Sequence, residues 1–212
     1  MSAFYFKKVP KFIQCLFSSA LWSEIPTQKT LYLTFDDGPH EESTLRLLAL
    51  LDRFDVKATF FCQGKQLHRM SELAAEIVSN GHRLANHGYT HQSSRQIPND
   101  RWLAELEETE KWIDKLTRSA QLYRPPYGRL TWCQYALLRK RETKLVMWSL
   151  MPGDFDMQQS DRECLEVLLS QTTAGDVIVL HDHAKTIQRL EFILPAYFMF
   201  CQSKGYRFEL LS

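Results

Sequence analysis

The sequence lacks the features that mark several classes of protein. It has no apolar run long enough to cross a membrane as a helix. It has no excess of one charge, since 26 Lys and Arg stand against 25 Asp and Glu and leave a formal net charge of +1. Glycine and proline are few, at eight each, and no stretch is of low complexity. A broad basic surface for nucleic acid, a strongly acidic tail and a disordered or fibrous chain are therefore excluded.

Cysteine is also scarce, and its placement excludes two kinds of structure. The five cysteines are widely scattered, odd in number and never in a C-x-x-C pair, so neither a disulfide framework nor a thiolate zinc site is indicated. We expect them to be small buried side chains in a reducing compartment. The 212 residues are 44% hydrophobic, which suits a single globular domain with a substantial core.

The N-terminal segment allows two interpretations. Three lysines precede an apolar run over 12–22 that contains small residues, as in a signal peptide. Gln14 interrupts that run, however, and the apolar positions follow the i, i+3, i+4, i+7, i+8 stripe of an amphipathic helix. The stripe consists of Ile13, Leu16, Phe17, Ala20 and Leu21. We predict a helix over 12–22 that packs on the core, and a cytoplasmic protein, with an exported or periplasmic one as the alternative.

Apolar, β-rich runs alternate with helical patterns along the rest of the chain. The predicted strands are 31–35, 58–62, 82–86, 122–124, 145–149, 177–180 and 206–210. Helical patterns cover 43–54, run from near 67 to 80, and recur over 102–116, from a capping box at 160–163 to before 175, and over 187–201 with a proline at 195. The alternation predicts one α/β domain with a parallel sheet. A nearly closed barrel and an open doubly wound sheet both fit it.

Two pairs of metal-binding residue types follow predicted strands. The first strand ends in Asp36 and Asp37, which is a costly arrangement without a counter-charge, although a simple turn cap explains it equally well. The third strand leads into His87 and His91, which on a helical turn would lie on one face and could share a metal ion. A carboxylate from the first strand would complete a set of two histidines and one carboxylate.

Other polar residues follow the fourth, fifth and sixth strands. Tyr127 carries the first free amide after Arg124 and two prolines, and such a stiff stem suits a donor aimed at an oxyanion. Asp154 follows the fifth strand. His181 directly follows a buried strand, where a general acid or base could sit. Taken singly, a turn with a solvated arginine and an ordinary core histidine are simpler readings. All these residues, however, fall at the carboxyl ends of strands, where parallel α/β folds build their sites.

With these motifs the chain resembles the polysaccharide deacetylase family, the NodB-homology domain of carbohydrate esterase family 4. Five ordered motifs carry the resemblance, at 34–39, 87–91, 124–128, around Asp154 and at 179–181. It spans 30–212 and implies a distorted (β/α)7 barrel as the single catalytic domain. Residues 1–29 would form an N-terminal segment with its helix packed on the barrel.

The resemblance also implies a metal-dependent amide hydrolase. Asp37, His87 and His91 would hold a divalent ion, zinc in most such enzymes, with cobalt, nickel or manganese as alternatives. The ion would polarise the acetyl carbonyl and acidify a water molecule, from which Asp36 would take a proton as general base. Two adjacent aspartates make sense here, because a carboxylate committed to a metal is a poor free base.

The remaining motif residues receive roles in the same way. His181 would protonate the departing amine, and Asp154 would tune the charge of His181. Arg124 would orient Asp36, and the backbone N–H of Tyr127 would help to stabilise the tetrahedral oxyanion.

The resemblance predicts removal of acetyl groups from N-acetylglucosamine-containing glycans, such as chitooligosaccharides or peptidoglycan. An O-acetyl sugar esterase, a hydrolase of small cyclic amides and a non-catalytic glycan-binding barrel are the alternatives, and the complete acid, base and metal set argues against the last. One departure is Phe155, where the family commonly has tryptophan; the aromatic wall beside His181 survives without the indole N–H. We expect His183 to lie in a loop or at the rim.

Overall fold

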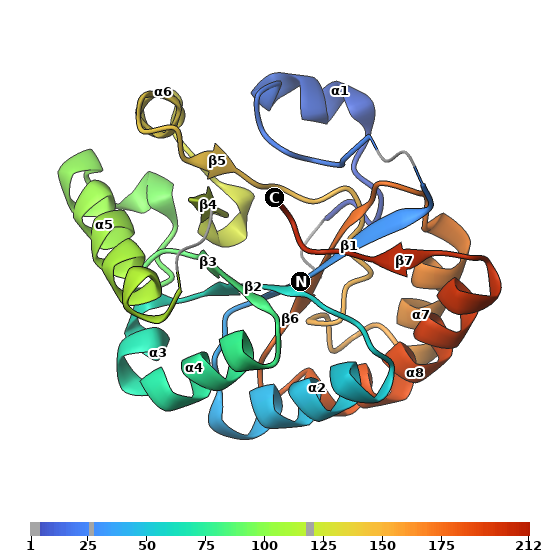
Figure 1. Cartoon of the computed structure of the whole chain (residues 1–212). Coiled ribbons are helices and arrows are strands. Elements are labelled where there is room, and N and C mark those ends of the chain that lie inside the picture. The colour runs from blue at the N-terminus through green and yellow to red at the C-terminus, as the bar shows by residue number, and fades with distance from the viewer. Residues whose placement is uncertain (1–4, 26–27, 118–120) are drawn as a thin grey trace.

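Parallel strands form one curved sheet at the centre of the molecule (Figure 1). The computed structural model describes residues 5–25, 28–117 and 121–212. The strands are β1 (Thr30–Asp36), β2 (Thr59–Cys62), β3 (Arg83–Asn86), β4 (Leu122–Tyr123), β5 (Lys144–Leu145), β6 (Val177–His181) and β7 (Arg207–Phe208). Their order is β5-β4-β3-β2-β1-β6, and β7 pairs with the start of β1. The predicted α/β domain with a parallel sheet is confirmed.

The chain after β5 curls the sheet towards closure. The predicted strand over 145–149 is only two residues long as a ladder, because the chain then leaves β4 and crosses to β6. There Leu150 forms a parallel bridge with Ile178, and the Val179 N–H donates to the Leu150 carbonyl at 3.0 Å. The sheet is therefore a distorted barrel and not an open doubly wound sheet.

Helices surround the sheet (Figure 1). Beyond the N-terminal segment they are α2 (Glu41–Arg53), α3 (Gly64–Arg69), α4 (Ser71–Ser79), α5 (Asn99–Leu116), α6 (Trp132–Lys140), α7 (Asp161–Gln171) and α8 (Ile187–Ser203). Short 3-10 turns lie at Ser94–Gln96 and Pro126–Gly128.

Two helical assignments from the sequence need correction. The helix expected from near 67 to 80 is two helices, α3 and α4, because the backbone of Met70 turns out of the helical region (φ −128°, ψ 49°). Helix α6 was not predicted, although Thr131 and Gln134 form a capping box at its start that the sequence displays. The capping box at Ser160 opens α7 as predicted.

The core lies between β1, β2 and the helices that cover them. Leu31, Leu33 and Phe35 of β1 are fully buried together with Leu47 and Leu51 of α2. Burial of each such side chain contributes about 2 kcal/mol to the free energy of folding before entropy is counted.

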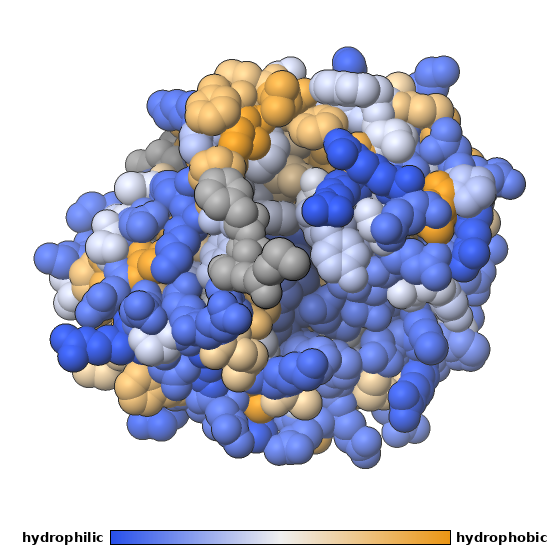
Figure 2. Space-filling model, turned by 180° about the vertical axis from the view of Figure 1, so that it is seen from behind, coloured by the Kyte–Doolittle hydropathy of each residue, from blue (hydrophilic) through white to orange (hydrophobic). Residues whose placement is uncertain are grey.

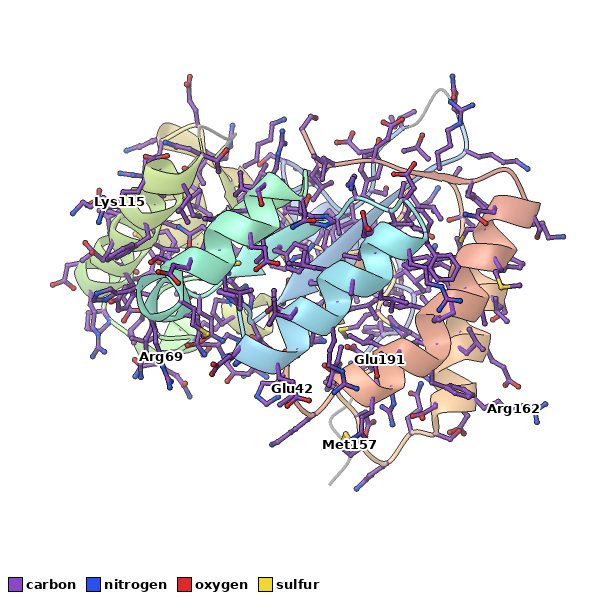
Figure 3. The ribbon with its side chains drawn as sticks, turned by 60° about the horizontal axis from the view of Figure 1, so that its bottom comes forward. Glu42, Arg69, Lys115, Met157, Arg162 and Glu191 are labelled. Carbon is purple, nitrogen blue, oxygen red and sulfur yellow. The ribbon has the colours of Figure 1, made fainter. Side chains whose placement is uncertain are left out.

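On the outside, α2 and α8 lie side by side, and Figure 3 shows Glu42 and Glu191 near each other at the ends of these helices. Arg46 joins them, since its guanidinium donates to Glu42 at 2.8 Å and to both carboxylate oxygens of Glu191. Ion pairs at the surface thus hold α2 and α8 together, in addition to their contacts in the core.

The N-terminal helix is shorter than predicted. It comprises α1 (Lys11–Gln14) and a 3-10 turn at Cys15–Phe17, so the helix expected over 12–22 is wrong in length. The reason is that Leu21 pairs with Val146, just after β5, and its N–H donates to the Leu145 carbonyl at 2.8 Å.

Only part of the predicted stripe is buried. Ile13, Phe17 and Ala20 contact a cluster that includes Trp22, whereas Leu16 is 58% exposed. Figure 2 shows apolar side chains gathered on the surface over α1, where Phe12 is 70% exposed. The domain boundary at residue 29 stays a prediction.

Residues 5–9, which we call the N-terminal strap, run antiparallel to residues 149–151. The Val9 N–H donates to the Ser149 carbonyl at 2.9 Å, and the Met151 N–H donates to the Lys7 carbonyl at 2.8 Å. The Lys8 ammonium lies 2.6 Å from the carboxylate of Asp176, which is only 2% exposed. The strap is therefore attached to the chain that leads from β5 into the loop around Asp154.

The cysteines are free thiols, but they are not all buried. Cys62, Cys164 and Cys201 lie in the core as expected, whereas Cys15 and Cys133 are exposed. No helix in the described residues has the length and apolar character that crossing a membrane requires.

Candidate active site

The predicted site residues converge on one cavity of about 460 Å³ at the carboxyl ends of the strands. The sheet register places Asp36, the last residue of β1, directly beside His181, the last residue of β6. His87 follows β3, which pairs through β2 with β1. The cavity wall includes six of the predicted residues: Asp36, Asp37, His87, His91, Tyr127 and His181. Arg124 and Asp154 lie fully buried just behind it.

Asp37, His87 and His91 form a compact group of potential metal ligands. One ligand atom from each lies within 4.8 Å of the others. The Asp37 Oδ1 atom is 3.0 Å from His91 Nε2 and 3.8 Å from His87 Nε2. The two histidines do not share a helical turn as predicted, because the chain after β3 is irregular. His91 instead adopts a left-handed backbone (φ 60°) that turns its ring back towards Asp37.

The protonation states of this group suit a metal ion. His87 Nδ1 is 2.8 Å from the Arg124 carbonyl, which can only accept, so Nδ1 carries the proton and Nε2 is left free to ligate. Burial lowers the pKa of His87 and keeps the ring neutral. For Asp37, burial would raise the pKa, but the hydrogen bond with His91 and the nearby imidazoles hold it well below its ordinary value. A neutral imidazole and an ionised carboxylate are the forms that bind a divalent cation.

Backbone strain is concentrated at the same place. Asp37 (φ 82°), His91 (φ 60°) and Tyr127 (φ 60°) all have positive φ values, which L-residues with side chains seldom adopt. Each such residue costs on the order of 1–3 kcal/mol and persists only where the surrounding structure holds it. The fold therefore maintains these three conformations at the cavity against their local preference.

Arg124 is a buried support for Asp36 and not the solvated arginine of the simpler reading. Its side chain is 0% exposed. The Nη1 atom donates to Asp36 Oδ1 at 2.6 Å and to Thr34 Oγ1 at 2.8 Å, and Nη2 donates to the Met147 carbonyl at 2.9 Å. One oxygen of Asp36 is thereby fixed, while Oδ2 lies 3.9 Å from His87 Nε2, beside the ligand group.

The half-buried His181 and the fully buried Asp154 form an ion pair. Asp154 Oδ1 is 3.0 Å from His181 Nδ1, and Asp154 Oδ2 accepts the His181 backbone N–H at 2.7 Å. Burial would lower the pKa of His181, but the charge of Asp154 and this hydrogen bond outweigh it and raise the pKa to about 9. His181 is therefore protonated at neutral pH, with Nε2 as the ring nitrogen that remains for a substrate.

This pair predicts the alkaline side of the pH profile. A reaction that needs protonated His181 should keep its rate until the pH approaches about 9 and then decline. In Asp154→Asn the nearest counter-charge is gone, and only the weaker effects of Asp36 and Asp37 still oppose burial, so the decline in kcat/KM should move to lower pH by roughly one to three units, the usual worth of an adjacent opposite charge. Zinc content should not change, because Asp154 does not contact the ligand group. An alkaline limb at the wild-type position would refute the assignment of His181 as the acid.

Asp182 is a buried residue of the site that the sequence analysis missed. Its carboxylate accepts hydrogen bonds from the Ser43 hydroxyl at 2.6 Å and from the Thr44 hydroxyl, both on α2. Its backbone N–H donates to the Asp36 carbonyl at 2.8 Å, and a Cβ atom at Gly38 would collide with its carboxylate. Asp182 thus fixes the turn that carries the two aspartates. The only indication of this role in the sequence is that a carboxylate follows a buried strand.

Arg189 was also missed, because it lies within a helical pattern. Its guanidinium, on α8, donates to the Asp154 carbonyl at 2.8 Å and to the Gln159 carbonyl at 2.6 Å. It therefore holds the loop that carries Asp154. His183 lies in the loop after β6, where its ring contacts that of His40 with centroids 4.8 Å apart.

An aromatic wall stands beside His181, as the sequence predicts. The Phe155 ring meets the His181 ring edge-on, with centroids 5.1 Å apart. On its other side, Phe155 contacts Tyr5 of the N-terminal strap, again at 5.1 Å.

Comparison with known proteins agrees with this geometry. A family model described as polysaccharide deacetylase matches residues 23–146, and the chain belongs to that family. The peptidoglycan-N-acetylglucosamine deacetylase of Bacillus cereus is 26% identical over 196 residues, or 90% of each chain. The chitooligosaccharide deacetylase of Rhizobium leguminosarum bv. phaseoli is 34% identical over 187 residues, or 79% of this chain and 80% of that protein.

Solved structures show the same fold. The crystal structure of a peptidoglycan N-acetylglucosamine deacetylase superimposes with a TM-score of 0.82 over 91% of both chains at 27% identity. A pseudoenzyme of the same family from Bacillus anthracis superimposes with a TM-score of 0.76 at 22% identity, over 88% of this chain and 65% of its own. The fold thus occurs in proteins with and without catalytic activity, so activity depends on the residues at the site and not on the fold alone.

Proposed function

We propose that this protein is a metal-dependent deacetylase that hydrolyses the N-acetyl group of N-acetylglucosamine units in glycans or oligosaccharides. One observation carries the proposal. A three-residue ligand group shares one cavity with a carboxylate fixed by a buried arginine and a histidine held in its protonated form. A glycan-binding module needs neither a base nor an acid in its pocket, and the family includes deacetylases of such sugars.

Asp37, His87 and His91 would hold the ion, and two imidazoles with one carboxylate favour zinc over magnesium or calcium. Such an ion, when bound, supplies a Lewis acid that polarises the acetyl carbonyl and promotes ionisation of water. Asp36 Oδ2 is the base that takes the proton of the attacking water, since Asp36 Oδ1 is committed to Arg124. Arg124 thereby sets the direction in which Asp36 can accept.

Tyr127 and His181 act on the two atoms that gain electron density in the reaction, the acetyl oxygen and the leaving nitrogen. No described residue accepts the Tyr127 backbone N–H, so this donor is available to the developing oxyanion. His181 gives its proton to the sugar nitrogen as the C–N bond breaks, and the ionised Asp154 stabilises the imidazolium beforehand. The products are acetate and the free amine.

The nearest alternative is hydrolysis of O-acetyl esters by the same groups. The pKa of His181 favours the amide, because a departing amine must be protonated whereas an alcohol is a better leaving group without help. A histidine held protonated up to about pH 9 suits the amide reaction.

Release of acetate tests the proposal. The zinc-loaded protein is incubated with N-acetylglucosamine oligomers of graded length, with peptidoglycan fragments and with O-acetylated sugars. We expect acetate and free amine in equal amounts from an N-acetylated substrate, loss of the reaction on chelation and its return with zinc. Reloading with cobalt, nickel or manganese compares the metals. Acetate from O-acetylated sugars alone would favour the esterase, and none from any substrate would overturn the proposal.

A further inference from the structure

The N-terminal strap contributes a side chain to the catalytic cavity. Tyr5 lines the same cavity as Asp36 and His181 and, like His181, lies outside the 23–146 region that the family model matches. Its ring contacts Phe155, and Phe155 contacts His181, so three rings in sequence form one side of the cavity.

Tyr5 is held firmly in this position. Its hydroxyl lies 3.0 Å from Gln159 Oε1 and 3.3 Å from Asp156 Oδ2, so its one proton is donated within the protein. Gly153 makes room for it, since a Cβ atom there would collide with the Tyr5 hydroxyl. The ion pair of Lys8 with Asp176 anchors the strap three residues further on. What this position leaves Tyr5 to contribute to ligand binding is chiefly its aromatic ring.

The chemistry of the reaction determines which part of a substrate meets this wall. His181 protonates the leaving nitrogen, which remains attached to the sugar, while the acetyl oxygen points to the Tyr127 N–H. The sugar ring must therefore lie on the His181 side, against Phe155 and Tyr5. A pyranose ring has an apolar C–H face with polar groups at its edge, and aromatic side chains are suited to cover such a face.

We propose that Tyr5 is a specificity-determining residue that, together with Phe155, forms an aromatic platform for the pyranose ring bearing the reacting acetamido group. This inference rests on the proposed function. Tyr5 touches no reacting group, so it acts on the binding of the sugar and not on bond cleavage. A segment outside the matched family region thus selects for a sugar as the leaving group.

The test compares Tyr5→Ala with two control variants. Tyr5→Phe keeps the ring and removes only the hydroxyl. Tyr135→Ala removes a tyrosine that also anchors the N-terminal segment, because its hydroxyl accepts the Ser19 N–H at 3.0 Å, but that lies outside the catalytic cavity. KM and kcat are measured on an N-acetylglucosamine oligomer with zinc-loaded protein, together with the Tm of each variant.

We expect Tyr5→Ala to raise KM roughly five- to tenfold, the worth of one aromatic contact, with kcat within about twofold of wild type. Tyr5→Phe and Tyr135→Ala should keep the wild-type KM even where the Tm falls. An unchanged KM in Tyr5→Ala, or an equal rise in Tyr135→Ala, would overturn the inference.

Calorimetric binding of the same oligomer separates this inference from the proposed function. It is measured in an Asp36→Asn background, in which turnover should be slow enough for binding to be measured before the substrate is consumed. If the wild type releases no acetate, the proposed function fails. Weaker oligomer binding by the double variant Asp36→Asn/Tyr5→Ala than by Asp36→Asn alone would still support the aromatic platform. Equal affinity with and without the Tyr5 ring, or no binding in either, overturns it.

Discussion

Asp37→Ala should abolish acetate release and reduce bound zinc far below stoichiometric. Asp37 supplies the only carboxylate oxygen in the ligand group, and its left-handed backbone directs that oxygen towards both imidazoles. Without it, only the two histidines remain, which bind a divalent ion more weakly and leave its charge uncompensated. Metal analysis after zinc loading and dialysis, alongside acetate release, measures both effects.

Added zinc should restore part of the activity of Asp37→Ala, because the defect lies in occupancy of the site. A variant that keeps a full complement of zinc would show that Asp37 is not a ligand. The adjacent aspartate provides the matched control, since it differs in its contacts and not in its residue type.

Asp36→Asn should retain zinc but lose turnover by roughly a hundred- to ten-thousand-fold, the usual contribution of a positioned general base. The asparagine oxygen can still accept from Arg124, so the shape of the site is kept. The amide cannot take a proton from water, however, and added zinc should not rescue the variant. Acetate release and zinc content are measured on the same samples.

Two results would contradict this division of roles. Equal loss of zinc from Asp36→Asn and Asp37→Ala would mean that both aspartates hold the ion. Full turnover in Asp36→Asn would mean that another group activates the water.

The position of the site could be predicted from the sequence because it depends on strand ends. In a parallel sheet the carboxyl ends of strands share one edge, so Asp36, His87 and His181 are neighbours once the strands are recognised. The register of β1 and β6 then sets Asp36 directly beside His181.

Local geometry was less predictable. His87 and His91 are four residues apart, and helical spacing offered a simple way to bring them together. The structure uses a left-handed turn at His91 instead, a conformation that only surrounding contacts can stabilise. Arg124 could likewise be read as solvated, because its burial depends on Thr34 and Asp36, which lie far away in the chain.

Residues that support the site from distant segments could not be predicted, because no sequence pattern marks their contacts. Tyr5 reaches Gln159 and Arg189 reaches the Asp154 loop through contacts between elements, not within one. The helix over 12–22 was overestimated for a related reason, since pairing of Leu21 beyond β5 competes with its helical periodicity. Sequence periodicity describes the secondary structure that an isolated segment favours. The structure of these segments is set instead by their contacts with other parts of the chain.

The position of β1 in the sheet has a consequence for how the protein folds. This strand is synthesised well before its partners β6 and β7, and the Thr34 hydroxyl donates to a carbonyl 144 residues later. Contacts of such sequence separation are slow to form because a long loop must close first. The edge of β1 that pairs with β6 therefore stays unpaired, with Asp36 at its end, until β6 has been synthesised together with His181. We therefore expect the contact between Asp36 and His181 to be among the last to form, and a nascent chain that lacks β6 to expose the apolar edge of β1 to aggregation.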